Sequence, residues 1–96
     1  MFHVYILYSK KLDRFYIGYT SKLDRRLEFH LNPTKNNAFT AKAKDWEIYF
    51  NLECETKSQA LAIEKHIKKM KSKIYIENLT RYPEMSTKLI EKYKSL

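Results

Sequence analysis

The sequence predicts an α+β domain in which a small, mainly antiparallel three-stranded sheet is flanked by helices. Three observations support this fold class. Short runs rich in apolar and aromatic residues dominate the first half of the chain, amphipathic helical patterns dominate the second half, and helix-capping signals separate them. At 96 residues the chain holds one modest core, so residues 1–96 are expected to form a single domain. The expected order of elements is β-β-α-β-α-α.

Three segments are predicted to be strands. Residues 2–8 alternate between two sets of side chains that are both largely apolar or aromatic, as in a strand covered on both faces. The polar stretch 9–14 fits a hairpin loop, so residues 15–19 should pair with the first strand in the antiparallel sense. Residues 45–53 form the third predicted strand and follow a polar, basic loop over residues 34–44.

A first helix is expected between the second and third strands. Ser21, with Asp24 three residues later, forms a variant of the capping box, and the pair Asn32-Pro33 ends the helix. Residues at helical spacing give this helix one apolar face: Leu23, Leu27, His30 and Leu31.

The second half of the chain is predicted to be helical. Thr56 to Gln59 is a standard capping box, and a helix runs from it to about Met70. Its inner face is expected to carry Ala60, Leu61, Ile63, Ile67 and Met70. Residues 73–82 and 83–96 are predicted to form two short helices. The apolar face of the last comprises Met85, Leu89, Tyr93 and Leu96.

The charge of the chain favours a polyanionic partner. It has 19 lysines and arginines against 11 acidic residues, a formal net charge of +8. The excess is even, with nine basic and five acidic residues in 1–48 and ten and six in 49–96. Nucleic acid is the first expectation and an anionic membrane surface the second. The alternative is that the charge serves solubility alone.

Cys54 is the only cysteine, which excludes an internal disulfide and a cysteine-based zinc site. A single cysteine and the lack of a signal-peptide pattern favour a reducing, cytoplasmic setting. No apolar run approaches the roughly 18–20 residues that span a bilayer, so no membrane partner is expected.

Gly18 is the only glycine, although about seven would be expected in a chain of this length. Glycine is favoured where φ is positive or where another group approaches the backbone closely. Within a strand it suggests a bulge, or a ligand lying against the backbone. Tyr5 and Tyr16 are expected on adjacent strands and could share a groove with Gly18. A phenol acts as a base only where cations stabilise the phenolate, and the alternative is that both are ordinary sheet aromatics.

Glu64 lies three residues after Leu61 and three before Ile67, within or beside the apolar stripe of its helix. A carboxylate there costs free energy unless it is paired or bound to a cation. One interpretation is an ion pair with Lys68 at i+4. The other is a ligand for a hard cation such as Mg²⁺, which takes one or two carboxylates and keeps its waters.

Basic residues supply further candidates. Arg26 and His30 are four residues apart and project from one side of the first helix, where Arg26 could clamp a phosphate and His30 could carry a proton. The alternative is a solvated arginine beside a partly buried histidine. Several lysines could track a phosphate backbone or simply form a solvated face: Lys35, Lys42, Lys44, Lys65, Lys68, Lys69, Lys71 and Lys73.

Taken together, these residues resemble the GIY-YIG nuclease family, in particular its small single-domain, UvrC N-terminal-like members, over about residues 2–70. His3-Val4-Tyr5 is similar to the first motif, with His in place of Gly, and Tyr16-Ile17-Gly18 matches the second in full. Residues 23–30 are similar to the following helix and residues 39–46 to the loop and strand entry. Residues 58–70 are similar to the helix that carries the family's glutamate.

The resemblance implies hydrolysis of DNA phosphodiester bonds. It places Glu64 as the ligand of one Mg²⁺ or Mn²⁺ ion and Arg26 as the group that stabilises charge on the phosphate. Tyr16 or Tyr5 would activate water, with His30 assisting proton transfer. The expected DNA contacts are Gly18, Lys42, Lys44 and Lys68.

The sequence therefore leaves two main candidate functions. The first is a metal-dependent DNA endonuclease, and the second is a nucleic-acid-binding module that keeps the fold without turnover. A basic protein-interaction module is a third, more distant alternative. At 96 residues, the chain is expected to lack a separate DNA-binding domain. Substrate choice must then come from the domain itself, from a protein partner or from a homodimer.

Overall fold

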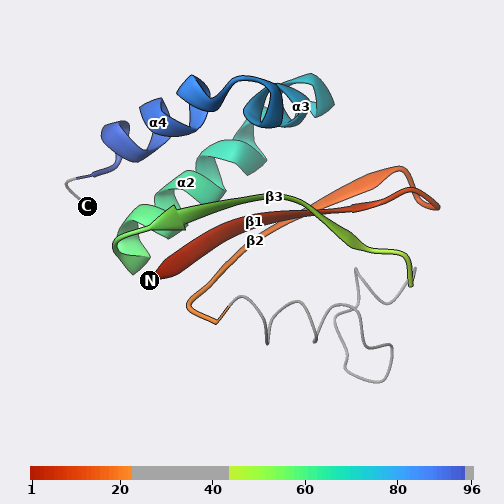
Figure 1. The fold of residues 1–96 in the computed structure, drawn as a ribbon, viewed down its shortest axis with the longest axis horizontal. Coiled ribbons are helices and arrows are strands. Elements are labelled where there is room, and N and C mark those ends of the chain that lie inside the picture. The colour runs from red at the N-terminus through yellow and green to blue at the C-terminus, as the bar shows by residue number, and fades with distance from the viewer. Residues whose placement is uncertain (23–43, 95–96) are drawn as a thin grey trace.

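The computed structural model describes residues 1–22 and 44–94 (Figure 1). Its elements in chain order are β1 (Phe2–Ser9), β2 (Arg14–Thr20), β3 (Glu47–Cys54), α2 (Lys57–Met70), α3 (Lys73–Arg81) and α4 (Pro83–Lys92). The predicted α+β class with a three-stranded sheet is confirmed. In the described residues, three helices follow β3, whereas the order β-β-α-β-α-α has two in that place. The segments 73–82 and 83–96, each predicted to be a short helix, form α3 and α4 as separate helices. The helix predicted to begin at Ser21 lies largely outside the described residues.

The sheet has the order β2-β1-β3, with both pairs antiparallel. β1 is therefore central, and β2 and β3 are its edges. The β1–β2 ladder keeps one register from His3↔Thr20 to Ser9↔Arg14. The β1–β3 ladder shifts between Ile6 and Leu7, so the sheet's irregularity lies on the β3 side and not at Gly18.

The two faces of β1 enter different cores. Val4 and Ile6 are fully buried and face α2, α3 and α4, which all cover the same side of the sheet (Figure 1). Tyr5 and Leu7 point to the opposite side and pack with Trp46. This arrangement explains why both alternating sets of the first strand are apolar or aromatic.

The start of α2 is fixed by a modified capping box. The Thr56 side chain accepts a hydrogen bond from the Gln59 N–H at 3.1 Å, as predicted. Gln59 Oε1, however, accepts from the Glu55 N–H at 2.8 Å, and its Nε2 donates to the carbonyl of Ile90 in α4 at 3.0 Å. Gln59 is 1% exposed, so one buried amide joins the beginning of α2 to α4.

The inner face of α2 is narrower than predicted. Ala60, Ile63 and Ile67 are buried, whereas Leu61 and Met70 are 40% and 45% exposed. Leu61 follows Ala60 directly, and one helical step of about 100° turns it away from the sheet. Met85, Leu89 and Tyr93 of the C-terminal region do pack on the core, as predicted.

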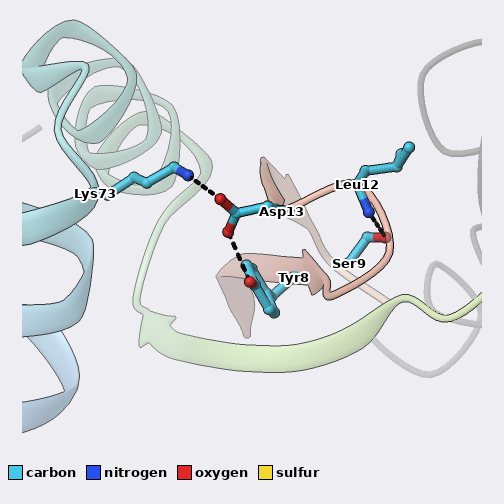
Figure 2. Close-up of polar contacts among 5 residues, drawn as sticks. All are labelled: Tyr8, Ser9, Leu12, Asp13 and Lys73. Carbon is cyan, nitrogen blue, oxygen red and sulfur yellow. Dashed lines mark hydrogen bonds and ion pairs between the residues drawn. The ribbon is translucent and has the colours of Figure 1, made fainter.

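The β1–β2 hairpin is tied to α3 through Asp13 (Figure 2). Asp13 adopts φ 50, a left-handed conformation that aspartate tolerates better than most residues. Its Oδ1 accepts from the Tyr8 hydroxyl and its Oδ2 from Lys73 Nζ, both at 2.7 Å. The Lys73 ammonium, then the Tyr8 hydroxyl, lower the pKa of the Asp13 carboxyl, and that carboxylate raises the pKa of Tyr8.

Asp45 secures the approach to β3. Its Oδ1 accepts from Ser9 Oγ at 2.6 Å and its Oδ2 from the Lys11 N–H at 2.8 Å, and these bonds lower the pKa of Asp45. The adjacent Trp46 is thereby held against the face of the sheet opposite the helices. No helix among residues 1–22 and 44–94 is long and apolar enough to cross a membrane.

Candidate active site

A cavity of about 210 Å³ lies at the β2 edge of the sheet. It is lined by Tyr5, Tyr16, Ile17, Gly18, Tyr19, Glu64 and Lys68. Ile17 and Tyr19 belong to the face of β2 that packs under the helices, and Tyr16 and Gly18 alternate with them. The cavity therefore bends around an edge strand, where α2 brings an acidic and a basic side chain to the sheet.

Gly18 owes its place to a close approach by Tyr5. The two residues are cross-strand partners, and a Cβ built on Gly18 would lie 2.6 Å from Tyr5 Oη and 2.7 Å from Tyr5 Cζ. The φ of Gly18 is not positive, and no bulge occurs in its ladder, so both of those explanations are wrong. The group that approaches the backbone is an aromatic side chain covering an edge-strand glycine.

The two candidate tyrosines lie in different environments. Their ring centroids are 6.4 Å apart and the rings are tilted by 31°. Tyr5 is 2% exposed and packs with Leu7 and Trp46, whereas Tyr16 is only partly buried at the edge of the same cluster. Tyr16 is therefore the phenol that a molecule arriving from solvent meets first.

Glu64 lies on α2 beside the buried stripe, with its side chain 14% exposed. Its Oε1 accepts from Lys68 Nζ at 2.9 Å, which is the i,i+4 pair that the sequence allowed. The Lys68 side chain is 54% exposed, and a pair so open to water is worth no more than about 1 kcal/mol. A ligand that offers more positive charge can therefore replace the lysine.

The donor set at Glu64 suits a hard cation. Among the described residues no cluster of three or more His, Cys, Asp or Glu side chains could hold a metal ion. A single carboxylate fits Mg²⁺ or Mn²⁺, which take one or two carboxylates and keep several waters. The described lining of the cavity thus combines one carboxylate with three phenols and one lysine.

The predicted site residues fall into three groups. Tyr5, Tyr16, Gly18, Glu64 and Lys68 meet in the cavity. Lys44 is exposed before β3 and does not line it. Arg26, His30 and Lys42 lie outside the described residues. Sequence reasoning missed Ile17 and Tyr19 as lining residues, because their alternation with Tyr16 and Gly18 places their side chains on the opposite face of the strand.

A model of the GIY-YIG catalytic domain matches residues 1–78, which include all residues that line the cavity. The chain belongs to the GIY-YIG nuclease family. Membership in a nuclease family implies DNA as the class of substrate. Neither the comparison with curated proteins nor that with solved structures finds a match.

The two segments that resemble the GIY-YIG motifs are paired at one position of the β1–β2 ladder. The first motif lies on β1 and ends at Tyr5, and the second lies on β2 and ends at Gly18. Tyr5 and Gly18 are partners in the antiparallel ladder. The tyrosine of one motif therefore fills the space that the glycine of the other leaves open.

Proposed function

We propose that this domain is a metal-dependent endonuclease that hydrolyses phosphodiester bonds in DNA. The observation that carries the proposal is the cavity where Glu64 of α2 meets Tyr5, Tyr16 and Gly18 of the sheet. Attack of water on a phosphodiester requires a proton acceptor and positive charge near the phosphate oxygens. A phenol, a carboxylate suited to a cation and a lysine supply these groups in one place.

Each residue has a proposed part. Glu64 would hold Mg²⁺ or Mn²⁺ in place of Lys68, and the bound ion would supply Lewis-acid stabilisation of the phosphate. Lys68, once released, is free to contact a phosphate oxygen. Tyr16 is the proposed proton acceptor because it is more exposed than Tyr5. Tyr5, packed against Gly18, positions the edge strand that carries Tyr16.

The remaining parts rest on the family pattern in the sequence. Arg26 would stabilise negative charge on the phosphate, and His30 would assist proton transfer. Lys42 and Lys44 would contact the DNA backbone, and Gly18 would let the DNA approach the strand. We place this activity in the cytoplasm, in DNA repair, with substrate choice made by the domain, by a homodimer or by a protein partner.

The test is cleavage of linear, nicked, flap and junction DNAs with Mg²⁺, Mn²⁺ or EDTA. We expect cleavage that EDTA abolishes and that Glu64→Gln and Tyr16→Phe each reduce by about a hundredfold or more. Matched controls are Glu77→Gln on the exposed side of α3 and Tyr82→Phe at the start of α4, neither of which lines the cavity. Both should keep the rate within about twofold of the wild type, since neither group reaches the substrate.

The same experiment distinguishes the alternative. Salt-dependent DNA binding without cleavage of any substrate would contradict an endonuclease. It would instead assign the chain as a catalytically inactive nucleic-acid-binding module with the GIY-YIG fold.

A further inference from the structure

A second and larger cavity, of about 630 Å³, lies between α2 and the end of α4. Its lining comprises Ala62, Lys65, His66, Lys69, Met70, Lys92 and Tyr93. Its described lining contains three lysines and no carboxylate, and its volume is within the range of ligand sites. We call it the α2/α4 groove. Among the described residues it shares none with the cavity at Glu64.

Two aromatic residues, His66 of α2 and Tyr93 at the end of α4, form the floor of the groove. His66 Nδ1 and the Tyr93 hydroxyl share a hydrogen bond of 3.0 Å, and the two rings meet edge to face. Tyr75 of α3 lies against His66 with its ring centroid 6.0 Å away. Lys92 Nζ lies 5.5 Å from the centre of the Tyr93 ring. The floor is therefore fixed, while Lys65 and Lys69 are exposed beside it.

The positive charge of the lysines reaches this floor. Burial, followed by the charges of Lys92 and Lys69, lowers the pKa of His66. The groove thus places three lysines around the hydrogen-bonded pair of His66 and Tyr93. Among the residues that the structure describes, no carboxylate lines the groove, and a bound anion would supply the missing negative charge.

The groove lies on the opposite flank of α2 from Glu64. At about 3.6 residues per turn, Glu64 and Lys68 share one flank, whereas His66 and Lys69 lie on the other. Lys65 lies between the two flanks on the exposed side. Lys68, Lys65 and Lys69 thus form a path of positive charge from one cavity to the other over the outside of the helix.

We propose that the α2/α4 groove binds a backbone phosphate of the DNA, on the flank of α2 that faces away from Glu64. Lys65, Lys69 and Lys92 would neutralise the phosphate, and the His66–Tyr93 pair would hydrogen-bond to it. The inference rests on the proposed function in taking DNA as the ligand. It does not depend on cleavage.

The first test measures the salt dependence of DNA binding in EDTA, where no cleavage occurs. A fluorescent duplex is titrated at several KCl concentrations with the wild type and with the Lys65→Ala/Lys69→Ala variant. Each lost phosphate contact lowers the slope of log K against log[salt] by about 0.9, so a decrease of about 1–2 is expected. Alanine is a better helix former than lysine, so the variant should fold.

The matched control removes equal charge elsewhere. Lys10→Ala/Lys11→Ala neutralises two exposed lysines of the β1–β2 hairpin, outside the groove. The slope of log K against log[salt] for this control should change by less than half as much as the slope for Lys65→Ala/Lys69→Ala. Equal changes for the two double variants would overturn the proposal, because general charge would then explain the binding.

The second test follows the ring signals of His66 and Tyr93 by NMR in EDTA, with and without a saturating oligonucleotide. The two side chains share a hydrogen bond of 3.0 Å in the groove. A phosphate that hydrogen-bonds to this pair changes the surroundings of both rings, so the signals of both residues should shift. Unchanged signals at saturation would overturn the proposal.

The two proposals fail in different ways. Cleavage of DNA together with an unchanged salt slope and unchanged His66 and Tyr93 signals would reject the groove and keep the endonuclease. The reduced slope and shifted signals without cleavage on any substrate would keep the groove and reject the endonuclease.

Discussion

The two flanks of α2 present different side chains to their surroundings: a carboxylate on one flank, and a histidine among lysines on the other. On one, Glu64 is 14% exposed and lies beside the tyrosines of the sheet in a cavity of about 210 Å³. On the other, His66 lies among three lysines in a groove of about 630 Å³ whose described lining has no carboxylate. In our two proposals, the first flank binds the reacting phosphate and the second binds a phosphate that does not react.

The difference shows how a domain with one small core can offer two sites. Ala60, Ile63 and Ile67 occupy the core side of α2 at spacings of three and four residues, which leaves both flanks open to other contacts. The sheet supplies the partners of one flank and α4 those of the other. The following predictions distinguish effects on the whole helix from effects on one flank alone.

The largest expected effect comes from Gln59, whose buried side chain joins the start of α2 to α4. Gln59→Ala would leave the Glu55 N–H and the Ile90 carbonyl unpaired near the start of α2, at a cost of about 2–4 kcal/mol in the free energy of unfolding. Urea unfolding measures this loss. Ser58→Ala, at the exposed neighbouring position, should cost far less. A loss below about 0.5 kcal/mol for Gln59→Ala, the range of an ordinary surface change, would show that the buried amide does not join the helices.

Gly18→Ala should damage only the Glu64 flank. The new methyl group meets the buried Tyr5 ring, so we expect a loss of about 1–3 kcal/mol in stability and a marked loss of cleavage. The salt slope of DNA binding attributed to the α2/α4 groove should remain.

A double-mutant cycle locates the cause of that loss. In a Tyr5→Leu background the shorter side chain leaves room for the methyl group, so Gly18→Ala should cost at least about 1 kcal/mol less than in the wild type. The same penalty in both backgrounds would contradict the packing explanation of this glycine.

The smallest effect concerns the ion pair at Glu64. Lys68→Ala removes the ammonium that competes for the carboxylate, so the midpoint for Mn²⁺ binding without DNA should fall, by less than about fivefold because the pair is exposed. Broadening of NMR signals near Glu64 by Mn²⁺ measures the midpoint. Lys69→Ala removes the same charge from the other flank and should leave the midpoint nearly unchanged. A midpoint that rises in Lys68→Ala would contradict competition between the lysine and the ion.

Much of the fold followed from local patterns. The alternation in residues 2–8 predicted a strand covered on both faces, and β1 has Val4 and Ile6 in one core and Tyr5 and Leu7 in the other. The capping residue Thr56 marked the start of α2. These features depend on neighbours a few positions apart, which the sequence displays directly.

Contacts between distant segments were harder to predict. Glu64 stood out as a carboxylate beside an apolar stripe, but its meeting with Gly18 depends on where α2 crosses the edge of the sheet. The explanation of Gly18 needed the register that pairs it with Tyr5. The pairing of His66 with Tyr93 gave no signal in the sequence, because their hydrogen bond depends on how α4 packs back on α2.

Cys54 gives the fold a built-in chemical reporter. It is the chain's single thiol, fully buried at the end of β3 where the strand meets the helices, and burial raises its pKa. A thiol-specific reagent can therefore label the native protein only when this junction opens. The labelling rate would give the opening free energy of the sheet–helix junction in the absence of denaturant, in the wild type and in every variant above.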